Sequence, residues 1–496
     1  MIRVVGGPDT VPGPPEAERA LLGPAPAVAA PSREDPVARV ASAVAGGPAG
    51  RRLAASGGFW CAATVLVLLA VALLGAGLVQ KQHCRAAGWS TPDMFWHECY
   101  TDIPVLYFSA HLGGAEALGP LEAVRSPGLG EPPLAALAMW AVAAVVGDGP
   151  TTQAARAFFD LSAVVLAGVL AVAVALVVAA AGRRRSWDAA HLALAPVLVT
   201  AGLLSYELLG VAFLAGAVLA WSRSRPLLAG LLLGAATCAT PAVAIVAVAI
   251  VAVAVRAGKA RPALVVAATT GAVWLGVRVL AYPGFTGELG SAWQGWKAAS
   301  PGYGSLWLVP SLLEQSRPPR ATIWFPGHAL SGSGATAGVL LAFVVVVVAT
   351  AALALAPRRR PRLAQVALFA VAGTLIVLKS LPVQASLLLL PLVALAGLRW
   401  RDHLLWASTE LAYFVGVWLY IAGASAANRG LPAGFYLVLL LGRLAGIGWL
   451  ALQAARAAAD PTRDRVRTPL DGADGEDDPI GGPVRDAEDR FVVELT

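Results

Sequence analysis

Residues 59–79 of the chain read FWCAATVLVLLAVALLGAGLV, about twenty consecutive residues that are almost all apolar. One α-helix of that length crosses the hydrocarbon core of a bilayer. Similar apolar runs recur along the chain, for example at 242–255 and 339–356. Hydrophobic residues make up 57% of the chain and charged residues only 14%, whereas a soluble domain has about 25% charged residues. The sequence therefore predicts an all-α, polytopic membrane protein.

Two polar tails flank the predicted transmembrane domain, which covers residues 59–456. Residues 1–58 are rich in Pro, Ala and Gly without apolar periodicity, and residues 457–496 combine basic residues with an acidic, Gly/Pro-rich stretch. Both compositions are typical of disordered segments. Residues 59–79 lie too far from the N-terminus and form too long an apolar run for a secretory signal, so we expect an uncleaved anchor.

Basic clusters between the apolar runs predict the orientation of the spans. The net charge of +7 comes largely from short arginine clusters, which mark cytoplasmic loops and not a nucleic-acid partner. This rule places both termini in the cytoplasm and predicts a multi-pass protein of the plasma membrane. About twelve spans follow (11–13), at residues 59–79, 158–181, 188–204, 206–221, 226–240, 241–255, 263–280, 336–356, 363–379, 383–398, 403–421 and 434–455.

One apolar segment, residues 133–147, does not fit as a full span, because it would invert every later basic cluster. We expect a half-helix or a tilted segment beside the first of two large outer loops, about 80–132 and about 281–335. Structureless loops of this length are usually functional. The second combines aromatic with cationic side chains, which suit sugars and phosphates, although an interfacial Trp/Tyr belt is the simpler interpretation. These residues are Trp293, Trp296, Tyr303, Trp307 and Trp324 with Lys297, Arg317, Arg320 and His328.

Two of the four cysteines, Cys84 and Cys99, fall in the first outer loop. That loop faces an oxidising compartment, so we expect them to form a disulfide. A zinc site made by both cysteines with His83 and His97 is the alternative, but no CxxC spacing supports it. We expect no resident metal or cofactor.

Asp102 lies in the same loop, within HECYTDIP (97–104). A carboxylate beside a membrane helix is costly unless a partner satisfies it or a reaction uses it. At the water interface it suits a general base. Three cations near the outer ends of spans, Lys379, Arg278 and Arg443, are candidates to hold a phosphate group. Lys379 and Arg443 could equally extend toward lipid headgroups, and for Arg278, close to a helix end, that role is the more common one.

Four segments resemble, in the same order, actinobacterial integral membrane proteins grouped with the family 87 glycosyltransferases of the GT-C superfamily. They are CYTDIPVLYF (99–108), LSYELLGVAF (204–213), LKSLPVQASLLLLPL (378–392) and ANRGLPAGFYLVLLLGRL (427–444). The resemblance covers roughly residues 60–460. It implies a GT-C-like membrane domain that transfers a mannose- or arabinose-like sugar from a polyprenyl-phosphate donor to a glycolipid or glycan acceptor of the cell envelope.

The resemblance also implies roles for particular residues. Asp102 takes the place of the family's catalytic base, and Lys379, Gln384, Glu207 and Glu131 fall in or near matching segments. Glu207 begins an apolar run, so capping the helix dipole is its alternative role. The chain departs from the family at Glu131-Pro132-Pro133, where Glu-Tyr-Pro is frequent, and at 237–241, which lacks a lysine.

Two other functions stay open. A transporter or flippase of envelope precursors would also place charges within a membrane, although the sequence shows no internal repeat. A non-catalytic scaffold for envelope assembly is the third, because the missing lysine weakens the donor-phosphate site. We expect the bilayer, the lipid-linked donor and the acceptor as partners, and no nucleic acid.

Overall fold

The computed structural model describes residues 2–4, 61–113, 118–126, 128–146, 151–282, 285–316, 330–426, 429–467 and 477–493. Within these ranges the chain is almost entirely helical, and the strands β1 (Ile2–Val4) and β2 (Phe491–Val493) form one antiparallel pair. The predicted all-α fold is therefore confirmed. The predicted tail 1–58 lies outside the described residues except for positions 2–4.

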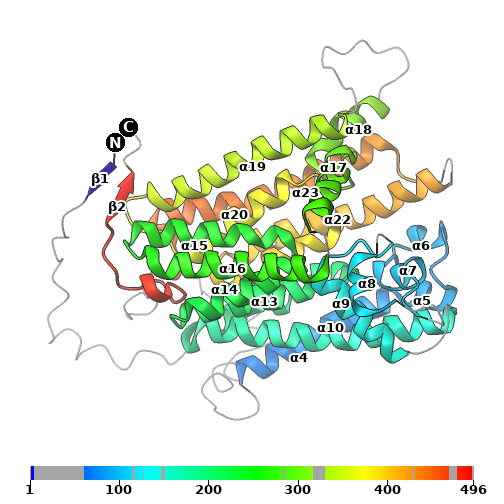
Figure 1. Cartoon of the computed structure of the whole chain (residues 1–496), viewed down its shortest axis with the longest axis horizontal. Coiled ribbons are helices and arrows are strands. Elements are labelled where there is room, and N and C mark those ends of the chain that lie inside the picture. The colour runs from blue at the N-terminus through cyan, green and yellow to red at the C-terminus, as the bar shows by residue number, and fades with distance from the viewer. Residues whose placement is uncertain are drawn as a thin grey trace.

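Six of the described helices are long and apolar enough to cross a membrane. These are α4 (Ala62–Gln80), α10 (Thr152–Ala181), α16 (Ala260–Ala281), α19 (Gly332–Leu355), α22 (Trp400–Ser425) and α23 (Ala433–Ala459). Figure 1 shows that the long helices run in roughly the same direction, as in a membrane helix bundle. The chain is thus a membrane protein, as its composition predicts.

Shorter apolar helices fill the spaces between the long ones. They are α9 (Pro133–Val146), α13 (Glu207–Ser222), α14 (Pro226–Ala239), η2 (Pro241–Ala244) with α15 (Ile245–Arg256), α20 (Leu363–Val377), and η4 (Val383–Leu388) with α21 (Leu389–Ala396). α14 packs against both α13 and α16, and α23 packs against α20 and α22. At about 1.5 Å per residue, the 14 residues of α9 span roughly 21 Å, which is less than the hydrocarbon core.

The predicted span 188–204 is not one helix. It consists of the end of η1 (Arg183–Ala189), then α11 (Ala190–Ala193) and α12 (Val197–Ala201). Pro196 stands between the last two and lacks the backbone donor that a continuous helix needs. Most of this segment is buried among other helices. Irregular backbone is tolerated at membrane depth when protein surrounds it in this way.

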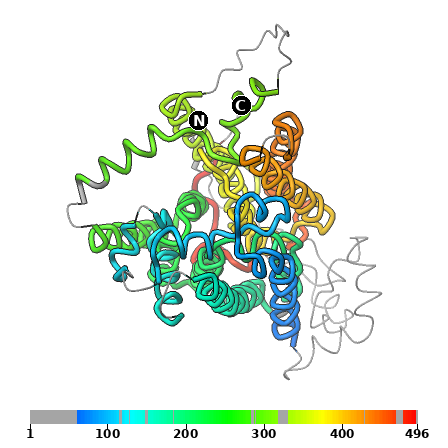
Figure 2. The backbone as a smooth tube through the Cα atoms, turned by 90° about the vertical axis from the view of Figure 1, so that its right-hand side faces the viewer, coloured from blue at the N-terminus to red at the C-terminus, as the bar shows by residue number. Residues whose placement is uncertain are grey.

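Short helices gather at one end of the bundle, which we call the Asp102 end (Figure 1). They are α5 (Gln82–Ala87), α6 (Asp93–Trp96), α7 (Asp102–Ser109), α8 (Pro120–Arg125), α17 (Phe285–Ala298), η3 (Leu306–Leu308) and α18 (Val309–Gln315). Helix α17 runs across the direction of the long helices, and Figure 2 shows it outside the main group. Its Trp293 and Trp296 are exposed. This placement fits a helix that lies along a membrane surface.

C-terminal residues cover the opposite end of the bundle, which we call the Arg362 end. Residues 477–493 and the chain up to 467, which belong to the predicted tail 457–496, contact the helix ends there. Arg362 is buried and its Nε donates to Asp464 at 2.9 Å, while Arg256 pairs with Asp489 at 2.7 Å. Buried guanidinium groups need carboxylate or carbonyl partners, and the acidic C-terminal segment supplies them.

Candidate functional site

Backbone and side-chain hydrogen bonds fix the start of α7, where Asp102 lies. Thr101 caps this helix, because its side chain accepts a hydrogen bond from the backbone N–H of Ile103. The Thr101 hydroxyl also donates to the carbonyl of Leu203 at 2.7 Å, and the backbone N–H of Asp102 donates to the carbonyl of Leu204 at 2.9 Å. The first loop is therefore anchored to the turn before α13.

Two side chains donate hydrogen bonds to the carboxylate of Asp102. The Tyr100 hydroxyl donates to Oδ1 at 2.7 Å, and Nε2 of Gln384 donates to Oδ2 at 3.1 Å. Burial raises the pKa of Asp102, and these two hydrogen bonds with the charge of Lys81 offset that effect only in part. Asp102 is thus a desolvated carboxylate of increased basicity, held in one orientation.

Two further carboxyl groups interact with this site. Burial raises the pKa of Glu131 to about 8, and the charges of Asp102 and Glu207 raise it in the same direction. Glu207 also stands in the first turn of α13, where a carboxylate favours the positive end of the helix dipole. Asp102 and Gln384 are therefore in direct contact, and the charges of Glu131 and Glu207, which the sequence also nominates, act on the same site.

Lys81, which sequence reasoning misses, is the cation that interacts with Asp102. It follows α4 directly, is fully buried, and donates from Nζ to the carbonyl of Tyr100 at 2.8 Å. Its Nζ also lies 5.0 Å from the centre of the Phe414 ring. Burial lowers the pKa of Lys81 to about 7, although Asp102 and Glu98 raise it. A lysine at the end of the first apolar run, in a chain with few lysines, is the signal that could have identified it.

Aromatic rings lie beside this pair of charges. The ring of Tyr100 is 5.4 Å from that of Phe95 and 4.6 Å from that of Trp418, between centres. Trp418 belongs to α22, so this cluster joins the first loop to the bundle.

The three cations predicted to hold a phosphate make other contacts. Lys379 donates to the carbonyls of Trp296 and Gly332, at 2.6 and 3.0 Å, and to Thr336 Oγ1 at 2.9 Å. Arg278 lies over the rings of Trp274 and Tyr282. The polar hydrogens of Lys379 are therefore already used within the protein.

Arg443 is likewise occupied. It is fully buried, its Nε donates to Glu410 at 3.0 Å, and its other nitrogens donate to the carbonyls of Leu381 and Pro382 at 2.7 and 2.8 Å. Those carbonyls stand just before Gln384. Arg443 thus shapes the segment that presents Gln384 to Asp102, and does not itself contact Asp102.

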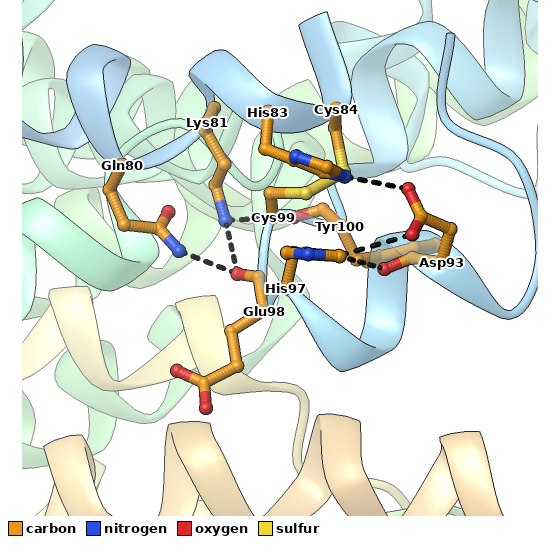
Figure 3. Close-up of a disulfide and its surroundings, with 9 residues drawn as sticks. All are labelled: Gln80, Lys81, His83, Cys84, Asp93, His97, Glu98, Cys99 and Tyr100. Carbon is orange, nitrogen blue, oxygen red and sulfur yellow. Dashed lines mark hydrogen bonds and ion pairs between the residues drawn. A yellow bond between two sulfur atoms is a disulfide. The ribbon is translucent and has the colours of Figure 1, made fainter. Parts of the chain in front are cut away.

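The structure contains the expected disulfide between Cys84 and Cys99 (Figure 3). It links α5 to the extended residues that precede Asp102, with 5.7 Å between the two Cα atoms. The same pairing makes both sulfurs unavailable as zinc ligands. The alternative site with two cysteines and two histidines is therefore not formed.

A cavity of about 290 Å³ lies at the Arg362 end, on the far side of the bundle from Asp102. Its basic lining consists of Arg399, Arg401, Arg456, Arg463 and Arg465. These residues follow the arginine pattern that predicts the cytoplasmic side. The cavity is therefore separate from the cluster around Asp102.

Comparison with protein-family models, with curated proteins and with solved structures finds no match for this chain.

Proposed function

We propose that the chain is a membrane glycosyltransferase that moves a sugar from a polyprenyl-phosphate donor to an acceptor on the extracytoplasmic face, with Asp102 as the base. The observation that carries this proposal is the half-buried Asp102 carboxylate, held by Tyr100 and Gln384 at one end of the bundle. We place this end of the bundle at the membrane surface, where Asp102 would reach both an acceptor in water and a donor in lipid.

The proposed reaction needs one carboxylate. Asp102 takes the proton from the acceptor hydroxyl, and the acceptor oxygen forms a bond to C1 of the sugar. The bond from C1 to the phosphate oxygen breaks, and polyprenyl phosphate leaves with the electron pair. Because the attack inverts C1 in one step, no covalent intermediate on the protein is required.

The leaving phosphate requires positive charge nearby. Lys379 and Arg443 are bound within the protein, so we assign them positioning roles. Lys81 is the buried cation that interacts with Asp102, and we propose that it contributes to the potential that the donor phosphate meets.

The test is sugar transfer in membranes that contain the full-length protein and the envelope acceptors, with labelled polyprenyl-phosphate mannose, arabinose and glucose as separate donors. We expect transfer from one donor and a loss of at least about 100-fold in Asp102→Asn. Glu122→Gln, an exposed carboxylate of the same loop, is the matched control. Equal transfer by Asp102→Asn contradicts the base, and transfer from none of the donors contradicts the function.

A second candidate is proton-coupled transport of an envelope precursor. The observation that favours it is Glu131, whose pKa of about 8 keeps it protonated at neutral pH beside Asp102 and Glu207. Carboxyl groups of this kind act as proton relays in transporters. Substrate-dependent proton uptake into liposomes, abolished in Glu131→Gln, would support transport over transfer.

A further inference from the structure

Three potential metal ligands lie together at the Asp102 end, apart from the carboxylate cluster. His83 Nε2 is 2.7 Å from Oδ2 of Asp93, and His97 Nδ1 is 3.2 Å from Oδ1 of the same carboxylate. One ligand atom from each of these three residues lies within 4.8 Å of the others. Figure 3 shows both imidazole rings directed at Asp93, next to the disulfide.

The backbone holds these ligands in place. Asp93 and His97 are one helical turn apart, and the backbone N–H of His97 donates to the carbonyl of Asp93 at 3.1 Å. His83 comes from α5, and the disulfide between its neighbour Cys84 and Cys99 ties that helix to the end of the same turn. The rings of His83 and His97 stack with their centres 3.5 Å apart. The three groups therefore meet without a change in the backbone, and the two rings need only rotate out of this stack for both nitrogens to face one ion.

We propose that His83, Asp93 and His97 bind a divalent transition metal, for which zinc is the best match. Two imidazoles with one carboxylate form a common three-ligand zinc set that leaves a coordination position for water. Calcium and magnesium prefer oxygen ligands alone, so two nitrogen ligands select against them.

Access and position support this inference. The side chains of His83 and His97 are 45% and 46% exposed, so a metal ion reaches them directly from solution. A bound ion would join α5 to α6 beside the disulfide, only a few residues before Tyr100 and Asp102. The ion would thus brace the loop that carries the proposed base, and it would not contact the reacting groups.

The test measures metal binding by full-length protein that carries no histidine tag and is stripped with a chelator in detergent. After dialysis against zinc chloride, we expect one zinc ion per chain and a higher midpoint of thermal unfolding. His83→Ala and His97→Ala should each weaken zinc binding at least tenfold, and the double variant should retain none. His111→Asn, an exposed histidine of the same loop, is the matched control and should bind as the parent does.

Two results would overturn the site: no zinc on the parent protein, or equal zinc on the parent and the double variant. The thermal midpoints of the metal-free variants show whether each one folds. Calcium chloride in place of zinc should leave the midpoint of the parent unchanged, and an equal shift with calcium contradicts the proposed ligand selectivity. Because binding is measured without sugar transfer, the result is independent of the proposed enzymatic function.

Discussion

Gln384 donates a hydrogen bond of 3.1 Å from its side-chain amide to Oδ2 of Asp102, although the two residues are 282 positions apart in the sequence. Arg443 holds the carbonyls of Leu381 and Pro382, just before Gln384, and Glu410 holds Arg443. The orientation of one carboxylate in the first loop therefore depends on a buried ion pair between α22 and α23.

Replacing Gln384 with Ala should slow the proposed sugar transfer. The change removes a donor to the charged form of Asp102, and a hydrogen bond to a charged group contributes roughly 1.5–3 kcal/mol, which corresponds to about 10- to 100-fold. The pKa of Asp102 should also rise, so the acidic limb of the pH–rate profile, where the base loses its proton, should move to higher pH. Transfer rates from pH 5 to 9 measure both effects. Gln315→Ala is the control, and an unshifted profile in Gln384→Ala would contradict the role of this contact.

Arg443→Met should destabilise the protein strongly, because it leaves Glu410 buried without its partner. Removal of one member of a buried ion pair costs about 3–5 kcal/mol. The double variant Arg443→Met/Glu410→Leu should recover most of the stability, but it still lacks the contacts to residues 381 and 382. Its thermal midpoint should thus approach that of the parent while transfer stays low. Full recovery of transfer would show that Arg443 does not position Gln384.

Loss of the disulfide should destabilise the first loop. For a pair separated by 15 residues, the chain-entropy estimate is about 3 kcal/mol. Cys84→Ser should therefore lower the midpoint of thermal unfolding, and Cys61→Ser, which removes a free thiol, should not. A reducing agent should lower the midpoint of the parent but not that of Cys84→Ser. Equal effects of reduction on both proteins would argue against this bond.

Asp464→Asn should weaken the contact between the C-terminal segment and the Arg362 end. Burial raises the pKa of Asp464, but Arg362 and backbone hydrogen bonding outweigh it, so the net pKa lies below the ordinary 3.8. A carboxyl group with a lowered pKa stabilises the fold above its unfolded pKa, and this contribution is lost as the pH falls through the folded pKa. The variant should be about 3–5 kcal/mol less stable at pH 7.

The difference between Asp464→Asn and the parent should shrink below about pH 4, where the parent begins to lose the same charge. Thermal unfolding at pH 7 and at pH 3 measures it. Asp460→Asn, an exposed carboxylate nearby, is the control and should have little effect at either pH. A difference that stays constant between pH 7 and pH 3 would show that the charge of Asp464 is not the stabilising feature.

Local patterns in the sequence predict the helices and part of the site. Apolar runs locate α16 and α19 within a few residues, and compartment chemistry predicts the Cys84–Cys99 pair. Such local patterns do not show which residues that are far apart in the sequence will contact each other. The sequence around Arg443, for example, does not show whether its charge pairs with Glu410 inside the protein or extends toward lipid headgroups.

The same limit explains the C-terminal segment. Its acidic, Gly/Pro-rich composition is typical of disorder when it is read alone. Its order in the structure depends on Arg256 and Arg362, which belong to helix ends far away in sequence. The helix break at Pro196 can be predicted from the proline. That prediction also requires neighbouring helices to bury the segment, because irregular backbone at membrane depth is tolerated only inside protein.

Glu131 should make the stability of the fold depend on pH between about 4.5 and 8. Its pKa rises from an ordinary 4.5 to about 8, so the folded protein holds a proton that the unfolded chain has released in this range. Stability should thus fall as the pH rises, with a slope of about 1.4 kcal/mol per pH unit for one proton. Glu131→Gln should remove that slope, and Glu122→Gln should keep it.

Thermal unfolding at intervals from pH 5 to 9 measures the slope, and equal slopes in the parent and Glu131→Gln would contradict the raised pKa. The proton on Glu131 also bears on the proposed base. A neutral Glu131 at pH 7 does not repel the charged form of Asp102, whereas an ionised Glu131 above pH 8 does.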